Sequence, residues 1–199
     1  MTFSKRDKAG WLGAIWRGRL ANCLQFAACQ AHRINLYHKS MKKEIKLPVS
    51  EGDSAPAFEA RTASGDIIRL SDLKGREVVL YFYPKDDTPG CTKEACGFRD
   101  QFAAFEKKGA VVLGVSPDPA RAHEKFTKKF SLPFPLLLDE EKKIINAYGV
   151  WGEKTFMGRK YMGVYRVTFL IGKDGRIKRI WPDVKPDEHA AEVLAAIGG

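Results

Sequence analysis

Two cysteines, Cys91 and Cys96, lie in a short segment that could carry out thiol chemistry. Thr88 followed by Pro89 is typical of a helix start, with Thr as the N-cap and Pro at the first helical position. Cys91 is then the third helical residue, where backbone N–H groups lack intrahelical acceptors. These donors and the positive end of the helix dipole favour thiolate over thiol. Cys91 is therefore a candidate nucleophile, and the alternative interpretation is a small buried hydrophobe.

The spacing of the two cysteines predicts a conformational change if they react with each other. In an intact helix, residues five apart have Cα atoms about 8.6 Å apart, beyond the roughly 7 Å limit for a disulfide. Cys91 and Cys96 can therefore pair only if the first turns unwind, and Gly90 and Gly97 lower the helix propensity there. The segment is therefore predicted to change conformation on oxidation, from a helix of low stability to an unwound disulfide form. A thioredoxin-type active site, with two residues between its cysteines, is excluded.

The elements around this segment alternate between strands and helices. A β-branched and aromatic run at 78–83 is typical of a strand buried on both faces. Further strands are expected at 67–70, 110–115, 136–138, 167–171 and 176–181, the last two joined by a hairpin turn at 172–175. Helices are expected from Thr88 through the run containing Phe98, Phe102 and Phe105, and at 120–130, 140–148 and 186–197. This order predicts an α/β three-layer fold with a central mixed sheet.

The composition is that of a globular protein without a metal-ligand pattern. The 199 residues are 44% hydrophobic and 29% charged, which fits one domain or one domain with an appendage. The sequence contains no run of about 18 apolar residues, so it predicts no membrane-spanning helix. Four cysteines are too few for a disulfide-stapled mini-protein, and no zinc-type spacing is present. The histidines also show no spacing suited to a metal, so no cofactor is expected; they are His32, His38, His123 and His189.

The basic charge of the chain belongs to its first residues. Of the net charge of +10, residues 1–43 carry +8, from nine bases and one acid. Residues 44–199 carry the remaining +2, from 25 bases and 23 acids, so this part is nearly neutral. The sequence thus divides into a basic N-terminal extension (1–43) and a domain (44–199). A basic tail can bind nucleic acid or an anionic membrane, or it can simply be solvated, and we favour solvation.

Several interpretations of the extension compete. A transit peptide is weakened because Arg19 intrudes on the apolar face, and a secretory signal because Arg17 and Arg19 interrupt the apolar run from Trp11. Residues 26–29 resemble a lipoprotein cleavage box, but Asn22 and Gln25 weaken the segment before it. We favour a biological start at Met41, which opens directly onto the patterned domain. The expected location is then the cytoplasm, with targeting to an organelle or the envelope left open by the extension. A nucleic-acid-binding or membrane-binding module remains the alternative of a different class, and its salt-dependent binding would disappear on removal of the residues before Met41.

The candidate segment resembles a known family. Pro84-x-x-x-Thr88-x-x-Cys91 is similar to the peroxiredoxin active-site signature, and residues 88–96 resemble the Q-type subgroup, also called bacterioferritin comigratory proteins. Residues 165–171 resemble the family's arginine-bearing strand, and 52–58 resemble its domain start. The resemblance runs from about residue 51 to 197 and implies a thioredoxin-like fold. The extension has no counterpart in the family pattern.

The resemblance also implies roles for individual residues. Cys91 would be the peroxidatic cysteine, whose thiolate attacks a peroxide and becomes a sulfenic acid. Thr88 and Arg166 would stabilise the thiolate and the reacting oxygens, Pro84 would shield them from water, and amides near Gly90 would hold the peroxide. Cys96 would be the resolving cysteine, forming an intramolecular disulfide with the sulfenic acid. The substrates would be hydrogen peroxide and organic hydroperoxides.

The expected partners follow from this cycle. A thioredoxin-like dithiol would reduce the disulfide by exchange. Because the resolving cysteine is in the same chain, no partner subunit is needed, and a monomer, with at most a weak dimer, is expected. No specific nucleic acid is expected as a partner. A general disulfide reductase or oxidase is the alternative on the same fold, but the cysteine spacing disfavours it; a glutathione peroxidase is disfavoured because its Trp-Asn-Phe motif is not found.

Overall fold

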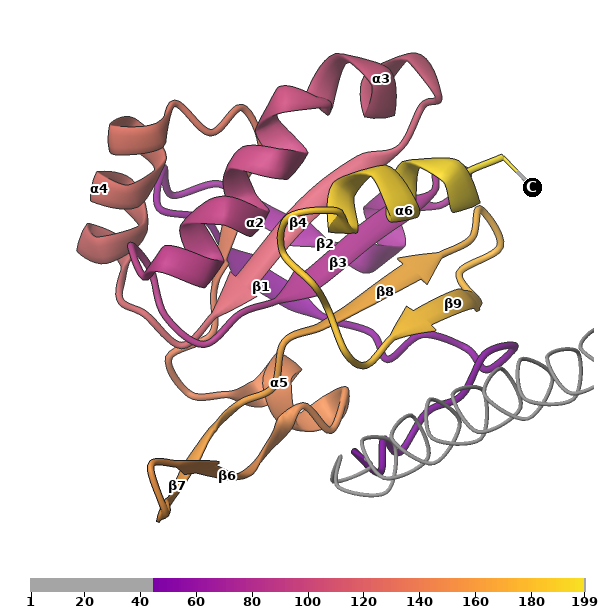
Figure 1. The fold of residues 1–199 in the computed structure, drawn as a ribbon. Helices are drawn as coiled ribbons and strands as arrows, with labels where there is room; N and C mark the ends of the chain where they lie inside the picture. Colours follow the sequence, from indigo (N-terminus) through magenta and orange to yellow (C-terminus); the bar gives the residue numbers. More distant parts are fainter. Residues whose placement is uncertain (1–44, 199) are drawn as a thin grey trace, which may run out of the picture. The chain divides into compact units, whose positions relative to one another are not determined.

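A five-stranded mixed sheet forms the centre of the fold in the computed structural model, which describes residues 45–198 (Figure 1). The strand order is β5-β4-β3-β8-β9, with β3 parallel to β4, β4 parallel to β5, and β8 antiparallel to both β3 and β9. The strands are β3 (Val78–Phe82), β4 (Val111–Ser116), β5 (Leu136–Leu138), β8 (Val167–Ile171) and β9 (Ile177–Trp181). The predicted central mixed sheet is confirmed.

Helices and a small hairpin cover the two faces of this sheet. The helices are α2 (Pro89–Asp100), α3 (Phe102–Lys107), α4 (Ala120–Phe130), α5 (Lys143–Ala147) and α6 (His189–Ala196). Every residue of β3 is buried, as expected for a strand covered on both sides. Val79 and Tyr81 face a core shared with α2, α3, α4 and α6, whereas Leu80 and Phe82 face a second core with α5 and the β1 strand (Glu59–Arg61). These are the three layers of an α/β fold.

Three predicted helices differ from those observed. The helix after Thr88 is divided at Gln101, where φ is −105° and ψ is 6°, into α2 and α3. The helix predicted at 140–148 shortens to α5 because Lys142 adopts the left-handed conformation, with φ of 59°. The helix predicted at 186–197 begins only at His189. The observed helix ends follow local backbone geometry, and the buried side chains of Tyr148 and Ile197 lie at the C-cap positions just beyond α5 and α6.

Three elements near the sheet were not predicted in full. The first hairpin pairs β1 with β2 (Ile67–Arg69), and a short 3-10 helix, η1 (Leu70–Leu73), then ends the strand expected at 67–70. The second hairpin pairs β6 (Trp151–Phe156) with β7 (Arg159–Val164). Its turn, Met157 and Gly158, has φ of 48° and 77°, as a two-residue type I′ turn requires. Most of β7 is exposed, so its sequence lacks the apolar alternation of a half-buried strand.

No helix among residues 45–198 is both long and apolar enough to cross a membrane. The interpretations of residues 1–43, including the start at Met41, concern residues outside that range.

Candidate active site

The N-terminus of α2 presents Cys91 as the sequence predicts. Thr88 is the N-cap residue in an extended conformation, Pro89 is the first helical residue, and Cys91 is the third. The ladder begins where the Thr92 amide donates to the Thr88 carbonyl at 2.8 Å. Helix geometry therefore leaves the amides of Gly90 and Cys91 without intrahelical acceptors, close to the thiol. The helix start is confirmed, and it places the sulfur at the positive end of the dipole.

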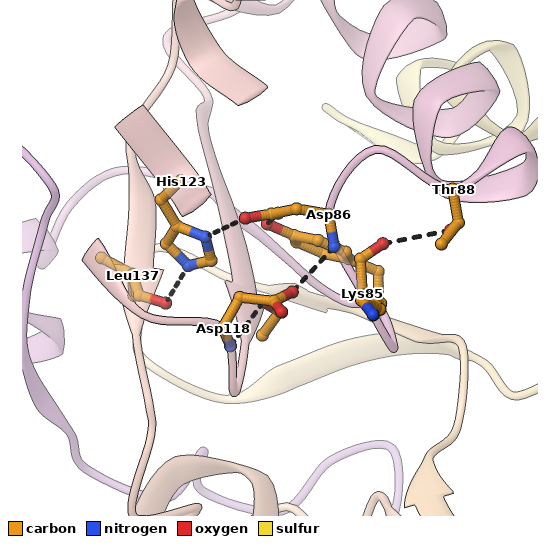
Figure 2. Close-up of polar contacts among 8 residues, drawn as sticks. Lys85, Asp86, Thr88, Asp118, His123 and Leu137 are labelled. Atoms are coloured by element: carbon orange, nitrogen blue, oxygen red, sulfur yellow. Dashed lines mark hydrogen bonds and ion pairs between the residues drawn. The ribbon is translucent and has the colours of Figure 1, made fainter. Parts of the chain in front are cut away.

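The hydroxyl of Thr88 does not cap the helix through its side chain. It donates instead to the carbonyl oxygen of Lys85, at 3.1 Å (Figure 2). This bond closes the loop that leads from β3 into α2. Thr88 is therefore an N-cap by position, and its hydroxyl bonds within the loop that precedes the helix.

A guanidinium group lies against the candidate nucleophile. Arg166 stands between β7 and β8, and its Nη2 donates to Sγ of Cys91 at 3.2 Å. Its Nη1 forms an ion pair with Oε2 of Glu94, one helical turn after Cys91. The Cys91 residue is 1% exposed and the Arg166 side chain 19% exposed. The sulfur is thus buried but covered by a charged group that reaches the surface, a setting that stabilises an anion on sulfur.

The carboxylate of Glu94 is fully buried and balances this guanidinium. Burial raises the pKa of Glu94 to about 7, although the attraction of Arg166 acts in the opposite direction. For Arg166, burial alone would lower the pKa, but the neighbouring Glu94 and Cys91 outweigh it and leave the pKa raised. The guanidinium of Arg166, which is always charged, thus lies between the carboxyl group of Glu94 and the sulfur of Cys91.

The glycine before Cys91 makes room for the guanidinium. A Cβ atom at Gly90 would lie 3.2 Å from Nη2 of Arg166, tighter than an ordinary contact. The absence of a side chain therefore lets Arg166 approach the helix end and the sulfur together. Gly90, Cys91 and Arg166, all predicted as site residues, are brought together here.

Two further predicted site residues lie nearby without a direct contact of this kind to the sulfur. Pro84 is half-buried and begins the loop after β3. Cys96 is half-buried in α2, and both cysteines are free thiols. Because α2 is helical through both positions, their Cα atoms are about 8.6 Å apart by helix geometry. This separation disfavours a dithiol that exchanges disulfides without a change of conformation.

A buried polar network holds the loop between β3 and α2, and Figure 2 shows it. Nδ1 of His123 lies 2.7 Å from Oδ2 of Asp86, and the Tyr83 hydroxyl donates to Oδ1 of the same carboxylate at 2.7 Å. The other nitrogen of His123 lies 3.2 Å from the Leu137 carbonyl. The Asp86 amide donates to Asp118 at 2.7 Å. The carboxylate of Asp86 therefore joins the loop to His123 of α4, and the imidazole of His123 in turn contacts β5.

The next residue of the loop is fastened to α4 as well. Asp87 has a φ of 53°, and Lys129 of α4 donates to both of its carboxylate oxygens, at 2.6 and 2.8 Å. His123 is not among the site residues predicted from the sequence. The signal that could have found it is a histidine three residues before Phe126 on the apolar face of α4, paired with the acids that follow a buried strand. No cluster of His, Cys, Asp and Glu suited to a metal ion is found in residues 45–198.

A mixed sheet of this topology, with a helix-terminal thiol beneath a guanidinium, defines a thiol peroxidase on a thioredoxin-like fold. A family model described as the AhpC/TSA family matches residues 51–180. The chain belongs to this family.

Similar proteins agree with this assignment. The chain is 50% identical over 151 residues to the putative peroxiredoxin bcp of Coxiella burnetii, covering 76% of this chain and 100% of the relative. It is 48% identical to peroxiredoxin Bcp of Bacillus subtilis, covering 76% and 96%. A structure of Xanthomonas campestris peroxiredoxin Q is similar with a TM-score of 0.67 and 37% identity, covering 77% and 94%. The expected peroxiredoxin resemblance and peroxidase activity are confirmed.

Proposed function

We propose that Cys91 is the peroxidatic cysteine and that it reduces hydrogen peroxide and organic hydroperoxides. Its thiolate attacks one oxygen of the O–O bond, forming an S–O bond while the O–O bond breaks. The leaving oxygen takes up a proton and departs as water or an alcohol, and Cys91 remains as a sulfenic acid. The 3.2 Å contact between Arg166 and the sulfur carries this proposal, because it places a positive charge against the atom that would attack as a thiolate.

The surrounding groups bind the peroxide and stabilise the charge that develops on it. Arg166 and the amides at the start of α2 supply hydrogen-bond donors beside the sulfur, and preorganised donors are most effective where charge develops in the reaction. The Thr88 hydroxyl donates to the Lys85 carbonyl, and its lone pairs accept a hydrogen bond from the O–H group of the peroxide. Pro84 limits access of water to the loop, and Gly90 leaves the space in which Arg166 and peroxide meet.

Cys96 then resolves the sulfenic acid. Its sulfur attacks Sγ of Cys91, an S–S bond forms, and the hydroxyl of the sulfenic acid leaves as water after taking up the thiol proton. Since an intact α2 holds the two cysteines beyond disulfide distance, the first turns of α2 unwind before this step. A thioredoxin-like dithiol reduces the Cys91–Cys96 disulfide by thiol–disulfide exchange and restores both thiols.

The assembly and location follow from the same cycle. Both redox cysteines belong to one helix, so a monomer is sufficient for turnover. The cycle requires a supply of reducing dithiol, which is a property of the cytosol. We therefore assign the chain to the cytoplasm, as a monomer.

The proposal is tested by titrating the reduced protein with hydrogen peroxide and following the cysteine peptides by mass spectrometry. Wild type should form the Cys91–Cys96 disulfide. Cys96→Ser should stop at sulfenic or sulfinic acid on residue 91, and Cys91→Ser should not consume peroxide rapidly. Rapid peroxide consumption by Cys91→Ser would refute the assignment of the nucleophile.

A further inference from the structure

Two hydrogen bonds from side chains to backbone carbonyls join strand β6 to the end of β7 and to Tyr165, the residue that precedes Arg166. The Tyr165 hydroxyl donates to the carbonyl oxygen of Glu153 at 2.8 Å. From the next residue along, Nζ of Lys154 donates to the carbonyl oxygen of Val164 at 3.0 Å. A side chain from β6 thus bonds to the backbone at the end of β7, and the side chain of Tyr165 bonds to the backbone of β6, immediately before Arg166. We call these two bonds the hairpin clasp.

Two glycines make the clasp possible. A Cβ atom at Gly152 would lie 2.6 Å from the Tyr165 ring, and one at Gly163 would lie 3.3 Å from Cδ of Lys154. The ring and the lysine stem therefore lie over positions that have no side chain. The Lys154 side chain runs along the hairpin to the Val164 carbonyl, two residues before Arg166, although lysines on exposed hairpins usually extend into water.

The ammonium group of Lys154 is half-buried and belongs to the electrostatic surroundings of the sulfur. Burial lowers the pKa of Lys154, the nearby charge of Arg166 lowers it further, and Cys91 acts in the opposite direction. A cation that interacts with Cys91 stabilises a negative charge there, by reciprocity of the Coulomb interaction. In a partly buried place, water screens this effect less than at the surface.

We propose that Lys154 is a positioning residue of the peroxide site, which fixes the segment leading to Arg166 and adds positive charge to the field at Cys91. The inference rests on the proposed role of Cys91 as the nucleophile. It assigns a function to the otherwise exposed β6–β7 hairpin. Lys154 is thus a second cation, carried by β6, near the segment of Arg166, whose guanidinium contacts the sulfur.

The other charged and titratable groups around the sulfur come from several elements. Glu94 of α2 is an acid paired with Arg166, and Tyr81 of β3 is a buried phenol whose pKa is raised by burial and by Glu94. His189 of α6 is a buried base whose pKa is lowered to about 4 by burial and by Arg166. Above pH 5 His189 is neutral, so among these three groups Glu94 is the one whose charge changes near neutral pH.

The test compares three substitutions of Lys154 in the full chain. Lys154→Met keeps the stem without charge or donor, Lys154→Gln keeps a donor without charge, and Lys154→Arg keeps both. The rate of Cys91 alkylation by iodoacetamide is measured against pH by mass spectrometry of the Cys91 peptide. For Met and Gln, the midpoint of this profile should rise by about half a unit to one unit, as expected for a cation outside direct contact. Lys154→Arg should keep the wild-type midpoint.

Peroxide kinetics give a second readout and a matched control. At one pH unit below the wild-type midpoint of the alkylation profile, the second-order rate constant for hydrogen peroxide should fall about threefold to tenfold in Lys154→Met and Lys154→Gln, in line with the shifted midpoint. Lys160→Met is the control, because this lysine lies on the same hairpin but is 71% exposed and pairs with Glu153 at 3.3 Å. It should leave both the midpoint and the rate constant as in wild type.

A purely structural clasp would give a different pattern. The inference is overturned if Lys154→Met and Lys154→Gln lower the thermal midpoint of unfolding but leave the alkylation profile of Cys91 unchanged. It is also overturned if Lys154→Arg does not keep the wild-type alkylation midpoint. Failure of the proposed function looks different, since Cys91→Ser would then still reduce peroxide in the same assay. If Lys154→Met does not fold, the Gln and Arg variants decide the question between them.

Discussion

Nη2 of Arg166 lies 3.2 Å from Sγ of Cys91, although the two residues are 75 positions apart in the chain. The sheet topology brings them together. Strand β8 runs antiparallel beside β3, and their pairing joins Val167, the first residue of β8, to Phe82, the last residue of β3. The residue before β8 and the loop after β3 therefore lie at the same end of these two paired strands. This loop leads directly into the helix that carries Cys91.

Replacing Arg166 by Met should affect both activity and stability. Loss of a preorganised charged donor at the reacting oxygens lowers the rate constant for peroxide by about 100-fold to 1000-fold. Removing one partner of a buried ion pair also destabilises the fold by about 3–5 kcal/mol, because Glu94 is left as a buried acid without its cation. The two effects are measured by stopped-flow peroxide kinetics and by urea unfolding at pH 8.

The double variant Arg166→Met with Glu94→Gln separates these effects. Neutralising the acid removes the uncompensated charge, so most of the lost stability should return while the rate constant stays low. If the double variant regains activity together with stability, then Arg166 acts only by keeping the fold intact. That outcome would contradict its role at the sulfur.

The stability of the protein should depend on pH through Glu94. Burial raises its folded-state pKa to about 7 from an ordinary value of 4.5, so between these pH values the folded state binds more protons than the unfolded state. The contribution of Glu94 is therefore fully present below pH 4.5 and is lost as the pH rises through 7. It amounts to up to about 3 kcal/mol.

This dependence is measured as a difference between wild type and Glu94→Gln, by urea unfolding from pH 4.5 to 8. The difference is needed because His189, whose pKa burial lowers to about 4, contributes in the opposite direction, with stability rising up to pH 6.5. The stability of wild type relative to Glu94→Gln should decrease with increasing pH. A difference that is constant over this range would mean that Glu94 keeps the same charge throughout.

Local chemistry explains why part of the site could be predicted from the sequence. The N-cap Thr88, the first helical Pro89 and the position of Cys91 follow from the order of residues along one helix turn, and all three are confirmed. The central strands could be predicted because continuous burial gives an unbroken apolar run, as in β3. The helix boundary at Gln101 could not, because Phe98, Phe102 and Phe105 keep a helical spacing across the break.

Contacts between distant segments are the part that the sequence alone does not determine. Nothing in the spacing of Glu94 and Arg166 shows that they pair, because their meeting depends on the order of strands in the sheet. His123 has no acid near it on its own helix face that would predict its bond to Asp86. Lys154 lies on a hairpin whose partner strand is exposed and lacks a burial pattern.

Oxidation should reduce the helix content of the protein. Pairing of Cys91 with Cys96 requires the first turns of α2 to unwind, since intact helix geometry holds their Cα atoms about 8.6 Å apart. Circular dichroism at 222 nm should therefore lose the signal of about two helical turns when one equivalent of hydrogen peroxide is added, and a dithiol should restore it. Cys96→Ser provides the control, because it is oxidised without forming the disulfide and should keep its helix signal. Equal helix signals in the reduced and disulfide forms of wild type would contradict the unwinding step.

A single methyl group in α2 should slow this unwinding without touching the sulfur. A Cβ atom at Gly97 would lie 3.5 Å from Cβ of Ala190 and 3.9 Å from the Pro186 carbonyl oxygen, both ordinary contacts. Gly97→Ala should therefore fit the folded helix and stabilise it by about 1 kcal/mol. A stabilisation of this size slows disulfide formation about fivefold, and the sulfenic acid persists long enough for more of it to become sulfinic acid.

The two kinetic phases of oxidation distinguish this effect from damage to the site. Gly97→Ala should keep the wild-type rate of sulfenic acid formation and lose only the rate of the second, disulfide-forming phase. Gly90→Ala is the matched comparison in the same helix, since its Cβ atom would lie 3.2 Å from Nη2 of Arg166 and displace the guanidinium. It should slow the first phase instead. If Gly97→Ala forms the disulfide as fast as wild type, then unwinding of α2 does not limit resolution, and Cys96 reaches Cys91 by another movement.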